Sequence, residues 1–155
     1  MSWTRCVGSG SRHWGRYGAA GLLLVAQDEG VRRVLVDRRA DWVHQGGTVG
    51  IPGGAIQKGE TVLDAALREA TEEAAGLDQL DPKLLGSHQQ PCDVCERWIY
   101  TTVVAGVPMV LPVKPRSHES AGYDWVEVGQ VEALPLHPGL RRAWPSLLTL
   151  LGRVS

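Results

Sequence analysis

The sequence has few cysteines and no apolar run of membrane-spanning length. Three cysteines occur in 155 residues, and this small, odd number argues against a disulfide framework. The first apolar run, Ala19–Ala26, is far too short to cross a bilayer, and the N-terminal residues lack the apolar core of a signal peptide. These absences predict a cytoplasmic protein that does not act at a membrane.

An excess of positive charge is also missing. The formal net charge is −1, which excludes a globally basic nucleic-acid binder, although a local basic patch is compatible with it. The composition of 43% hydrophobic and 21% charged residues is that of one ordinary folded domain. Residues 1–16 are rich in Gly, Ser and Arg without periodicity, so we expect a loosely ordered arm there and a single domain over residues 17–155.

Two of the cysteines form a CxxC motif, Cys92 and Cys95, with His88 upstream. A structural zinc ion needs about four ligands, and the sequence contains no second pair. We therefore predict a loop with free or occasionally oxidised thiols and no bound zinc.

The remaining sequence predicts strands on both sides of a central helix. Apolar spacing favours a helix from about Thr61 to Ala75, with Gly76 as its C-cap. A second amphipathic helix closes the chain, with Pro138 near its start and Pro145 at a kink or break. The strands are expected in a hairpin and in four later segments: 19–26 with 31–38, then 48–51, 83–90, 97–107 and 123–128. This order predicts an α/β fold in which helices cover both faces of a mixed sheet.

The central helix carries an unusual row of acids. Glu69, Glu72 and Glu73 lie at positions i, i+3 and i+4, so their side chains are neighbours and repel by a few tenths of a kcal/mol per pair. Such a row could be a solvated surface, could pair with basic residues, or could hold hard cations. Carboxylate oxygens are the ligands that Mg²⁺ and Mn²⁺ prefer, and a divalent ion would remove the repulsion.

Neighbouring residues fit the cation reading. Gly53 and Gly54 lie in the turn before the helix, where a backbone carbonyl could approach the same ion closely. Arg68 adjoins the glutamates and could pair with Glu60, which would fix the loop against the helix.

The spacing of these residues resembles the Nudix box, G-x5-E-x7-R-E-U-x-E-E-x-G-U, of the MutT-like Nudix hydrolases. The matching positions are Gly54, Glu60, Arg68, Glu69, Ala70, Glu72 and Glu73. The last glycine departs from the pattern, because Ala75 stands in its place and Gly76 follows one residue later. We expect a helix one residue longer and an intact acidic site, since every acid lies upstream of the departure.

This resemblance implies a Nudix-type α/β/α sandwich, with the box helix on one face of the sheet and the C-terminal helix on the other. It implies hydrolysis of a nucleoside diphosphate linked to another group, with Mg²⁺ or Mn²⁺ as cofactor. The positions that it assigns to metal binding are Gly53, Glu69, Glu72 and Glu73. Glu60 and Arg68 are the orienting pair that it implies. The general base is left open between the box glutamates, Glu72 and Glu73 among them, and a loop acid, for which Glu119 is the candidate.

Contacts with the rest of the substrate are less constrained. The basic residues that could contact phosphates are Arg38, Arg39, Lys58, Arg97 and Arg116. The aromatic residues that could stack on a base are Trp42, Trp98, Tyr100 and Trp125. Core packing is the expected role of Trp98 and Trp125, because both lie in predicted strands.

The expected partner is a small nucleotide rather than a nucleic acid. A (d)NTP or a modified nucleotide is favoured, since a chain of this length leaves little room for a further recognition domain. The alternatives are ADP-ribose, a sugar nucleotide, and a catalytically inactive Nudix domain that only binds a nucleotide. An isomerase of the same fold would need a cysteine upstream of the box, where only Cys6 lies, and an mRNA-decapping enzyme would need a basic track. The oligomeric state is left open, with a homodimer as one option.

Overall fold

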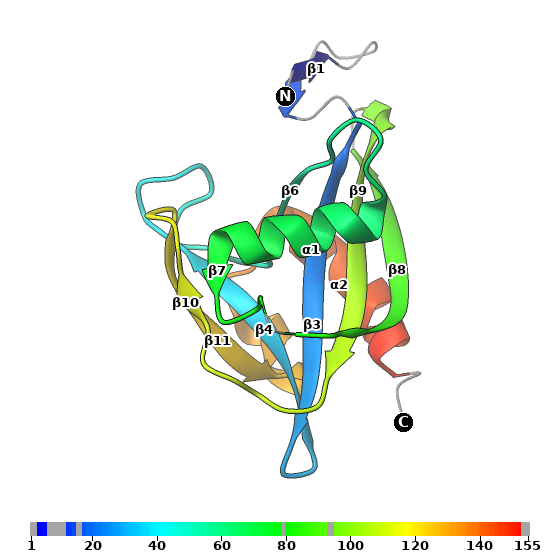
Figure 1. Cartoon of the computed structure of the whole chain (residues 1–155). Helices are drawn as coiled ribbons and strands as arrows, with labels where there is room; N and C mark the ends of the chain where they lie inside the picture. Colours follow the sequence, from blue (N-terminus) through cyan, green and yellow to red (C-terminus); the bar gives the residue numbers. More distant parts are fainter. Residues whose placement is uncertain (1–2, 6–11, 15–16, 79, 93–94, 153–155) are drawn as a thin grey trace.

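A mixed β-sheet forms the centre of this computed structural model, which describes residues 3–5, 12–14, 17–78, 80–92 and 95–152 (Figure 1). Its main path runs in the order β11-β4-β3-β9-β8, with β5 paired to β4 and β6 paired to β3. The bounds of these strands are β3 Ala19–Asp28, β4 Val31–Arg39, β5 Val49–Gly50, β6 Gly53–Ala55, β8 Lys83–Cys92, β9 Cys95–Val107 and β11 Ser120–Glu127. The predicted hairpin, short strand and later strands are therefore present.

The central strand β3 has two kinds of neighbour. It pairs antiparallel with β4, as the short turn between them predicts, and parallel with β9, where Ala19 lies opposite Tyr100. Its residues Ala19–Ala26 are all buried, as expected of a strand that is covered on both faces.

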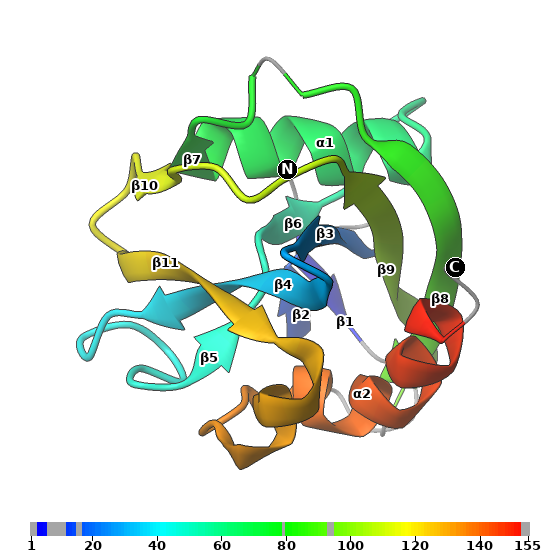
Figure 2. The same cartoon turned by 90° about the horizontal axis from the view of Figure 1, so that it is seen from below.

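One helix covers each face of the sheet, which confirms the predicted sandwich (Figure 2). Alternate residues of β3 point to opposite faces. Leu22 and Leu24 join the core beneath helix α1 (Val62–Glu73), and Leu23 and Val25 join the core beneath helix α2 (Pro138–Leu151). A 3-10 turn, η1 (Val128–Ala133), leads from β11 toward α2.

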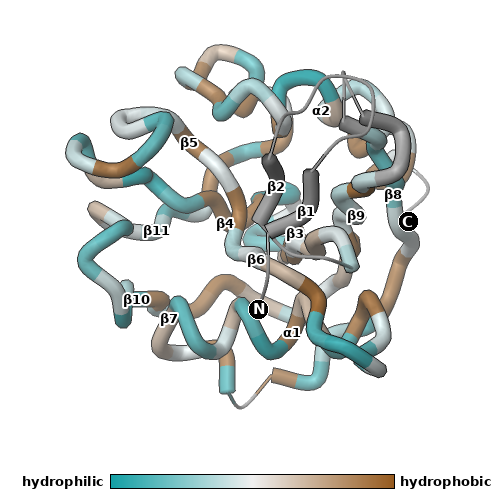
Figure 3. Tube along the Cα trace, turned by 90° about the horizontal axis from the view of Figure 1, so that it is seen from above, coloured by the Kyte–Doolittle hydropathy of each residue, from teal (hydrophilic) through white to brown (hydrophobic). Residues whose placement is uncertain are grey.

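Helix α1 begins where the sequence predicts and ends earlier. The Thr61 hydroxyl caps it by accepting a hydrogen bond from the Asp64 N–H. Figure 3 shows both hydrophilic and hydrophobic residues along this helix. The expected C-cap at Gly76 is wrong, because Ala74 already has an extended backbone. Ala74–Ala75 form strand β7, which pairs with strand β10, Lys114–Pro115. Backbone pairing with a distant segment thus ends the helix before the glycine is reached.

Two expectations about prolines also need correction. Of the two alternatives expected near Pro145, a kink or a break, the break is absent, because helix α2 continues past this residue. Pro91 lies within β8, beyond residue 90 where the predicted strand ends, and Cys92 at the end of β8 lies opposite Cys95 at the start of β9. The side chains of both cysteines lie outside the described residues.

The predicted arm contains a two-stranded antiparallel sheet, β1 (Trp3–Arg5) with β2 (Arg12–Trp14). No helix in the described part of the chain has the length and apolarity that crossing a bilayer requires.

Candidate active site

Arg68 organises the acidic face of α1. Its Nε and Nη2 atoms donate to the two carboxylate oxygens of Glu60, at 2.7 and 3.0 Å, and Nη2 also donates to the Ala55 carbonyl at 3.0 Å. Its Nη1 atom lies 2.9 Å from a Glu69 oxygen and 3.3 Å from a Glu72 oxygen. The hydrogen bond from Arg68 lowers the pKa of Glu60, and the same bond raises the pKa of Arg68. The pairing of Glu60 and Arg68 that the sequence predicts is therefore present.

Glu73 differs from the other two glutamates because it turns toward the sheet. One of its carboxylate oxygens accepts a hydrogen bond of 3.3 Å from the Gly53 N–H in β6. Burial, together with the nearby Glu69 carboxylate, raises the pKa of Glu73 from 4.5 to about 8. A cation bound beside Glu73 would favour the ionised form of this carboxyl group.

Two further acids lie near Glu73, one predicted and one missed. Glu119 is exposed in the loop before β11, and its charge raises the pKa of both Glu73 and Asp37. Asp37 in β4 is only 8% exposed and accepts a hydrogen bond from the Ser120 hydroxyl. The sequence does signal Asp37, because it is a single acid next to the apolar run of a predicted strand. The sequence does not show which other elements lie beside it.

Glycines allow the strands to approach these acids closely. A Cβ atom on Gly54 would lie 2.5 Å from the Glu69 carboxyl carbon. A Cβ atom on Gly53 would lie 2.6 Å from the Tyr100 hydroxyl oxygen. Any larger residue at either position would therefore displace a side chain of the site.

The chemistry of the donors matches a hard divalent cation. All candidate donors are carboxylate or backbone carbonyl oxygens, as Mg²⁺ and Mn²⁺ prefer. Among the residues that the structure describes, no three His, Cys, Asp or Glu side chains converge on one point where an ion could bind. The reason is that Arg68 holds Glu69 and Glu72 while Glu73 turns to Gly53. Glu69 and Glu72 would therefore have to turn from Arg68 to share an ion with Glu73.

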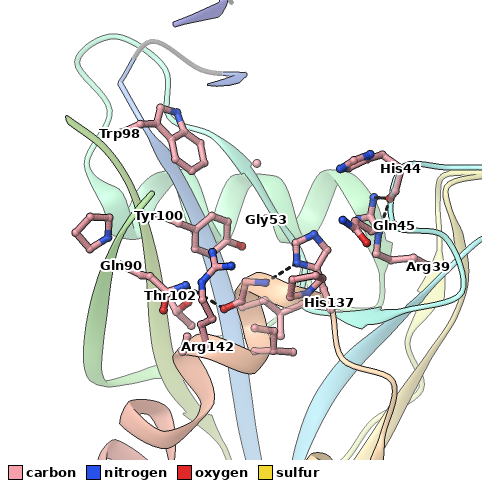
Figure 4. A pocket seen from close by; sticks show the side chains of 18 residues that line it. Arg39, His44, Gln45, Gly53, Gln90, Trp98, Tyr100, Thr102, His137 and Arg142 are labelled. Atoms are coloured by element: carbon pink, nitrogen blue, oxygen red, sulfur yellow. Dashed lines mark hydrogen bonds between the residues drawn. The ribbon is translucent and has the colours of Figure 1, made fainter. Parts of the chain in front are cut away.

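A cavity of about 480 Å³ adjoins the glutamates at Gly53 and Gly54 (Figure 4). Trp98 and Tyr100 from β9 form one side of it, and Arg39, His44 and Gln45 lie on the other side. The start of α2 completes its wall with residues that include His137, Gly139 and Arg142. Its volume is in the range of small-molecule sites, and two aromatic rings line it.

The structure divides the predicted substrate residues. Arg39, Trp98 and Tyr100 line the cavity, so the expectation that Trp98 packs in the core is wrong. Trp42 is 75% exposed and does not line the cavity, and neither does exposed Lys58.

The other predicted residues point elsewhere. Arg38 forms an ion pair of 2.6 Å with Asp124, and Arg116 forms one of 2.9 Å with Asp78. Trp125 packs against the core beneath α1, as expected, and the side chain of Arg97 lies outside the described residues.

Comparison with known protein families agrees with the geometry of the glutamates and with the spacing of the Nudix-box residues. Residues 15–147 match the NUDIX domain family. The chain belongs to the Nudix family. This Nudix domain is 45% identical over 144 residues to a Mycobacterium tuberculosis protein named "Putative 8-oxo-dGTP diphosphatase 3", a match that spans 91% of the chain and 66% of that protein. The chain thus spans slightly less than two thirds of the length of this curated relative.

Two further similarities extend along nearly the whole chain. The crystal structure of RenU, a Nudix hydrolase from M. smegmatis, superposes with a TM-score of 0.88 at 39% identity, covering 99% of this chain and 96% of that one. A Bifidobacterium longum protein named as a nucleoside triphosphate pyrophosphatase/Nudix hydrolase fusion is 34% identical over 99% of this chain and 32% of its own length.

Proposed function

We propose that this Nudix domain hydrolyses the pyrophosphate linkage of a nucleoside diphosphate derivative, with Mg²⁺ or Mn²⁺ as cofactor. A (d)NTP or an oxidised nucleotide is the favoured substrate. The observation that carries the proposal is the half-buried Glu73 carboxyl group beside Gly53, at the edge of a cavity large enough for a nucleoside. The name of the Mycobacterium tuberculosis relative makes 8-oxo-dGTP the first nucleotide to assay.

The residues divide the chemistry between them. Glu69, Glu72, Glu73 and the Gly53 carbonyl would hold the cation, which when bound neutralises the diphosphate and makes water more acidic. Arg68 fixes the turn before α1 through its paired contacts with Glu60. Glu119 lies exposed close to Glu73, where its carboxylate could accept the proton of the attacking water.

The test is a panel of nucleotides incubated with the protein and Mg²⁺ or Mn²⁺, with released phosphate and pyrophosphate measured. We expect turnover of at least one nucleoside triphosphate, loss of turnover in excess chelator, and a strong decrease in Glu73→Gln. ADP-ribose and a sugar nucleotide belong in the panel, because turnover of these alone would replace the favoured substrate class. Nucleotide binding without hydrolysis of any member would favour the regulatory alternative instead.

A further inference from the structure

Glu119, the candidate general base, lies in an exposed turn, yet hydrogen bonds hold the backbone around it at several points. Its carbonyl accepts a hydrogen bond of 2.8 Å from the Ala40 N–H, and its own N–H donates to the Ser117 hydroxyl at 3.1 Å. The next residue, Ser120, begins β11, and its hydroxyl donates to the Asp37 carboxylate in β4. The turn that carries Glu119 is therefore anchored to a buried acid of the sheet.

The bond to Asp37 forms at a β-bulge, where β11 pairs with β4 (Figure 2). Between Ser120 and Gly122, β11 has one residue more than the facing part of β4. The Ser120 hydroxyl also accepts a hydrogen bond of 3.1 Å from the Gly122 N–H, so it closes the bulge. Bulges are common beside active sites, where they redirect a side chain. Because this bulge directly follows Glu119, one hydroxyl group holds both the bulge and the end of the turn.

The presence of an acid at position 37 is costly for the sheet. Asp37 is almost fully buried, and the loss of hydration raises its pKa, although the charges of Arg38 and Arg39 offset part of this effect. Both arginines direct their side-chain hydrogen bonds to other partners. A valine would match the apolar residues that precede Asp37 in β4 and would have no charge to bury. Stability alone therefore does not explain why an acid accepts the Ser120 hydroxyl here.

We propose that Asp37 and Ser120 are positioning residues, which hold the turn so that the Glu119 carboxylate stays beside Glu73. The assignment rests on the proposed function. In that reaction the attacking water gives a proton to Glu119 while its oxygen forms a bond to phosphorus, and the bridging oxygen leaves with the other phosphate group. A displacement of about 1 Å can lower the rate of such a step about a hundredfold, so an exposed base gains from an anchored turn.

Steady-state kinetics tests the role of Ser120, with the triphosphate that the wild type hydrolyses fastest as substrate. Ser120→Ala should lower kcat about tenfold to hundredfold, while KM and the Mg²⁺ affinity change less than about threefold. Ser120→Thr keeps a hydroxyl group, so its kcat should stay within about threefold of the wild type. Ser87→Ala is the matched control, because it removes an exposed serine hydroxyl from β8, at the other end of the strand order, and its kcat should be unchanged.

Asp37→Val separates positioning from stability. The variant should melt at or above the temperature of the wild type, since no acid is left to bury, and yet its kcat should decrease about as much as that of Ser120→Ala. Asp37→Asn keeps an oxygen that accepts from Ser120, so its kcat should stay within about threefold of the wild type. If Asp37 served the fold alone, a fully stable Asp37→Val would instead retain its activity.

A double-mutant cycle shows whether Ser120 acts through Glu119. Glu119→Gln removes the base, so nothing is left for Ser120 to position. Adding Ser120→Ala to this variant should therefore lower kcat less than about twofold. Losses that multiply in the double variant would show that Ser120 acts independently of Glu119, and this result would overturn the assignment.

Failure of the assignment differs from failure of the proposed function. If the wild type hydrolyses a triphosphate but Ser120→Ala or Glu119→Gln has a normal kcat, the assignment is overturned and the hydrolase function stands. The same holds if Ser120→Thr is as slow as Ser120→Ala while both remain folded in thermal melts. If the wild type hydrolyses no nucleotide of the panel, the proposed function is overturned, and the assignment is overturned with it.

Discussion

Replacing Glu73 with Gln should change stability in a way that depends on both pH and metal. In the metal-free protein, burial and the charge of Glu69 raise the pKa of Glu73 from 4.5 to about 8. The folded protein therefore keeps this proton to a higher pH than the unfolded chain does. It follows that the unfolding free energy of the wild type decreases as pH rises from about 4.5 to about 8, and changes little from this cause above that range.

The magnitude follows from the size of the shift. At about 1.4 kcal/mol per pKa unit, the rise sets an upper bound of about 5 kcal/mol for the cost of ionising Glu73 in the folded state. Solvent reaches part of this side chain, so we expect about 2–3 kcal/mol. For a domain of this size that corresponds to roughly 5–10 °C in melting temperature.

Glutamine has no charge to bury, so the variant should escape this cost. In chelator at pH 5, the melting temperature of Glu73→Gln should be close to that of the wild type. As the pH is raised toward pH 9, the variant's melting temperature should exceed that of the wild type by a growing margin. Glu72→Gln is the matched control, because the Glu72 side chain is 58% exposed and its replacement should open no such pH-dependent gap. Thermal melts across this pH range, with and without chelator, provide the measurement.

Addition of Mg²⁺ should reverse the order. An ion that binds the folded protein at a hundred times its Kd stabilises it by about 2.7 kcal/mol, and the wild type should gain more of this than Glu73→Gln. The same substitution should lower kcat about 10²–10³-fold. If the difference in melting temperature between the wild type and Glu73→Gln in chelator were the same at all pH values, the predicted cost of ionising Glu73 would be refuted. A near-normal kcat would refute the role of Glu73 in metal binding.

Three further substitutions separate the other parts of the site. Glu119→Gln should lower kcat while changing the Mg²⁺ affinity little, and unchanged kinetics would show that Glu119 is merely solvated. Arg68→Lys keeps the charge but loses the paired contact with Glu60, so chemical denaturation should show a loss of about 1–3 kcal/mol. Gly54→Ala would force the Glu69 carboxylate from its place, so calorimetry should show weaker Mg²⁺ binding; an unchanged affinity would argue against Glu69 as a ligand.

The sequence predicts the local features of this domain well. Helical spacing gave the start of α1 at the Thr61 cap, and the pairing of Glu60 with Arg68 follows from residues that lie close in the chain. Two apolar runs on either side of a short polar turn likewise predicted the β3–β4 hairpin. Each of these depends on interactions within one element or between adjacent ones, which a single sequence records directly.

The parts that were wrong or missed depend on distant segments. Helix α1 ends at Glu73 because Ala74 pairs with β10, and no residue near Gly76 reveals that pairing. Trp98 has the surroundings of a core residue in its strand, but the side to which it points is a cavity closed by α2.

The parallel pairing of β3 with β9 has a consequence for how the chain acquires its structure. Ala19 lies opposite Tyr100, and the residues that cover the second face of β3 include those of α2, near the end of the described chain. Contacts between residues so far apart in sequence raise the contact order, and loop closure then slows folding. We expect the hairpin of β3 and β4 to remain without its core while the ribosome makes β9 and α2. An interval in which the most apolar strand is unprotected is when such a domain is most prone to aggregate.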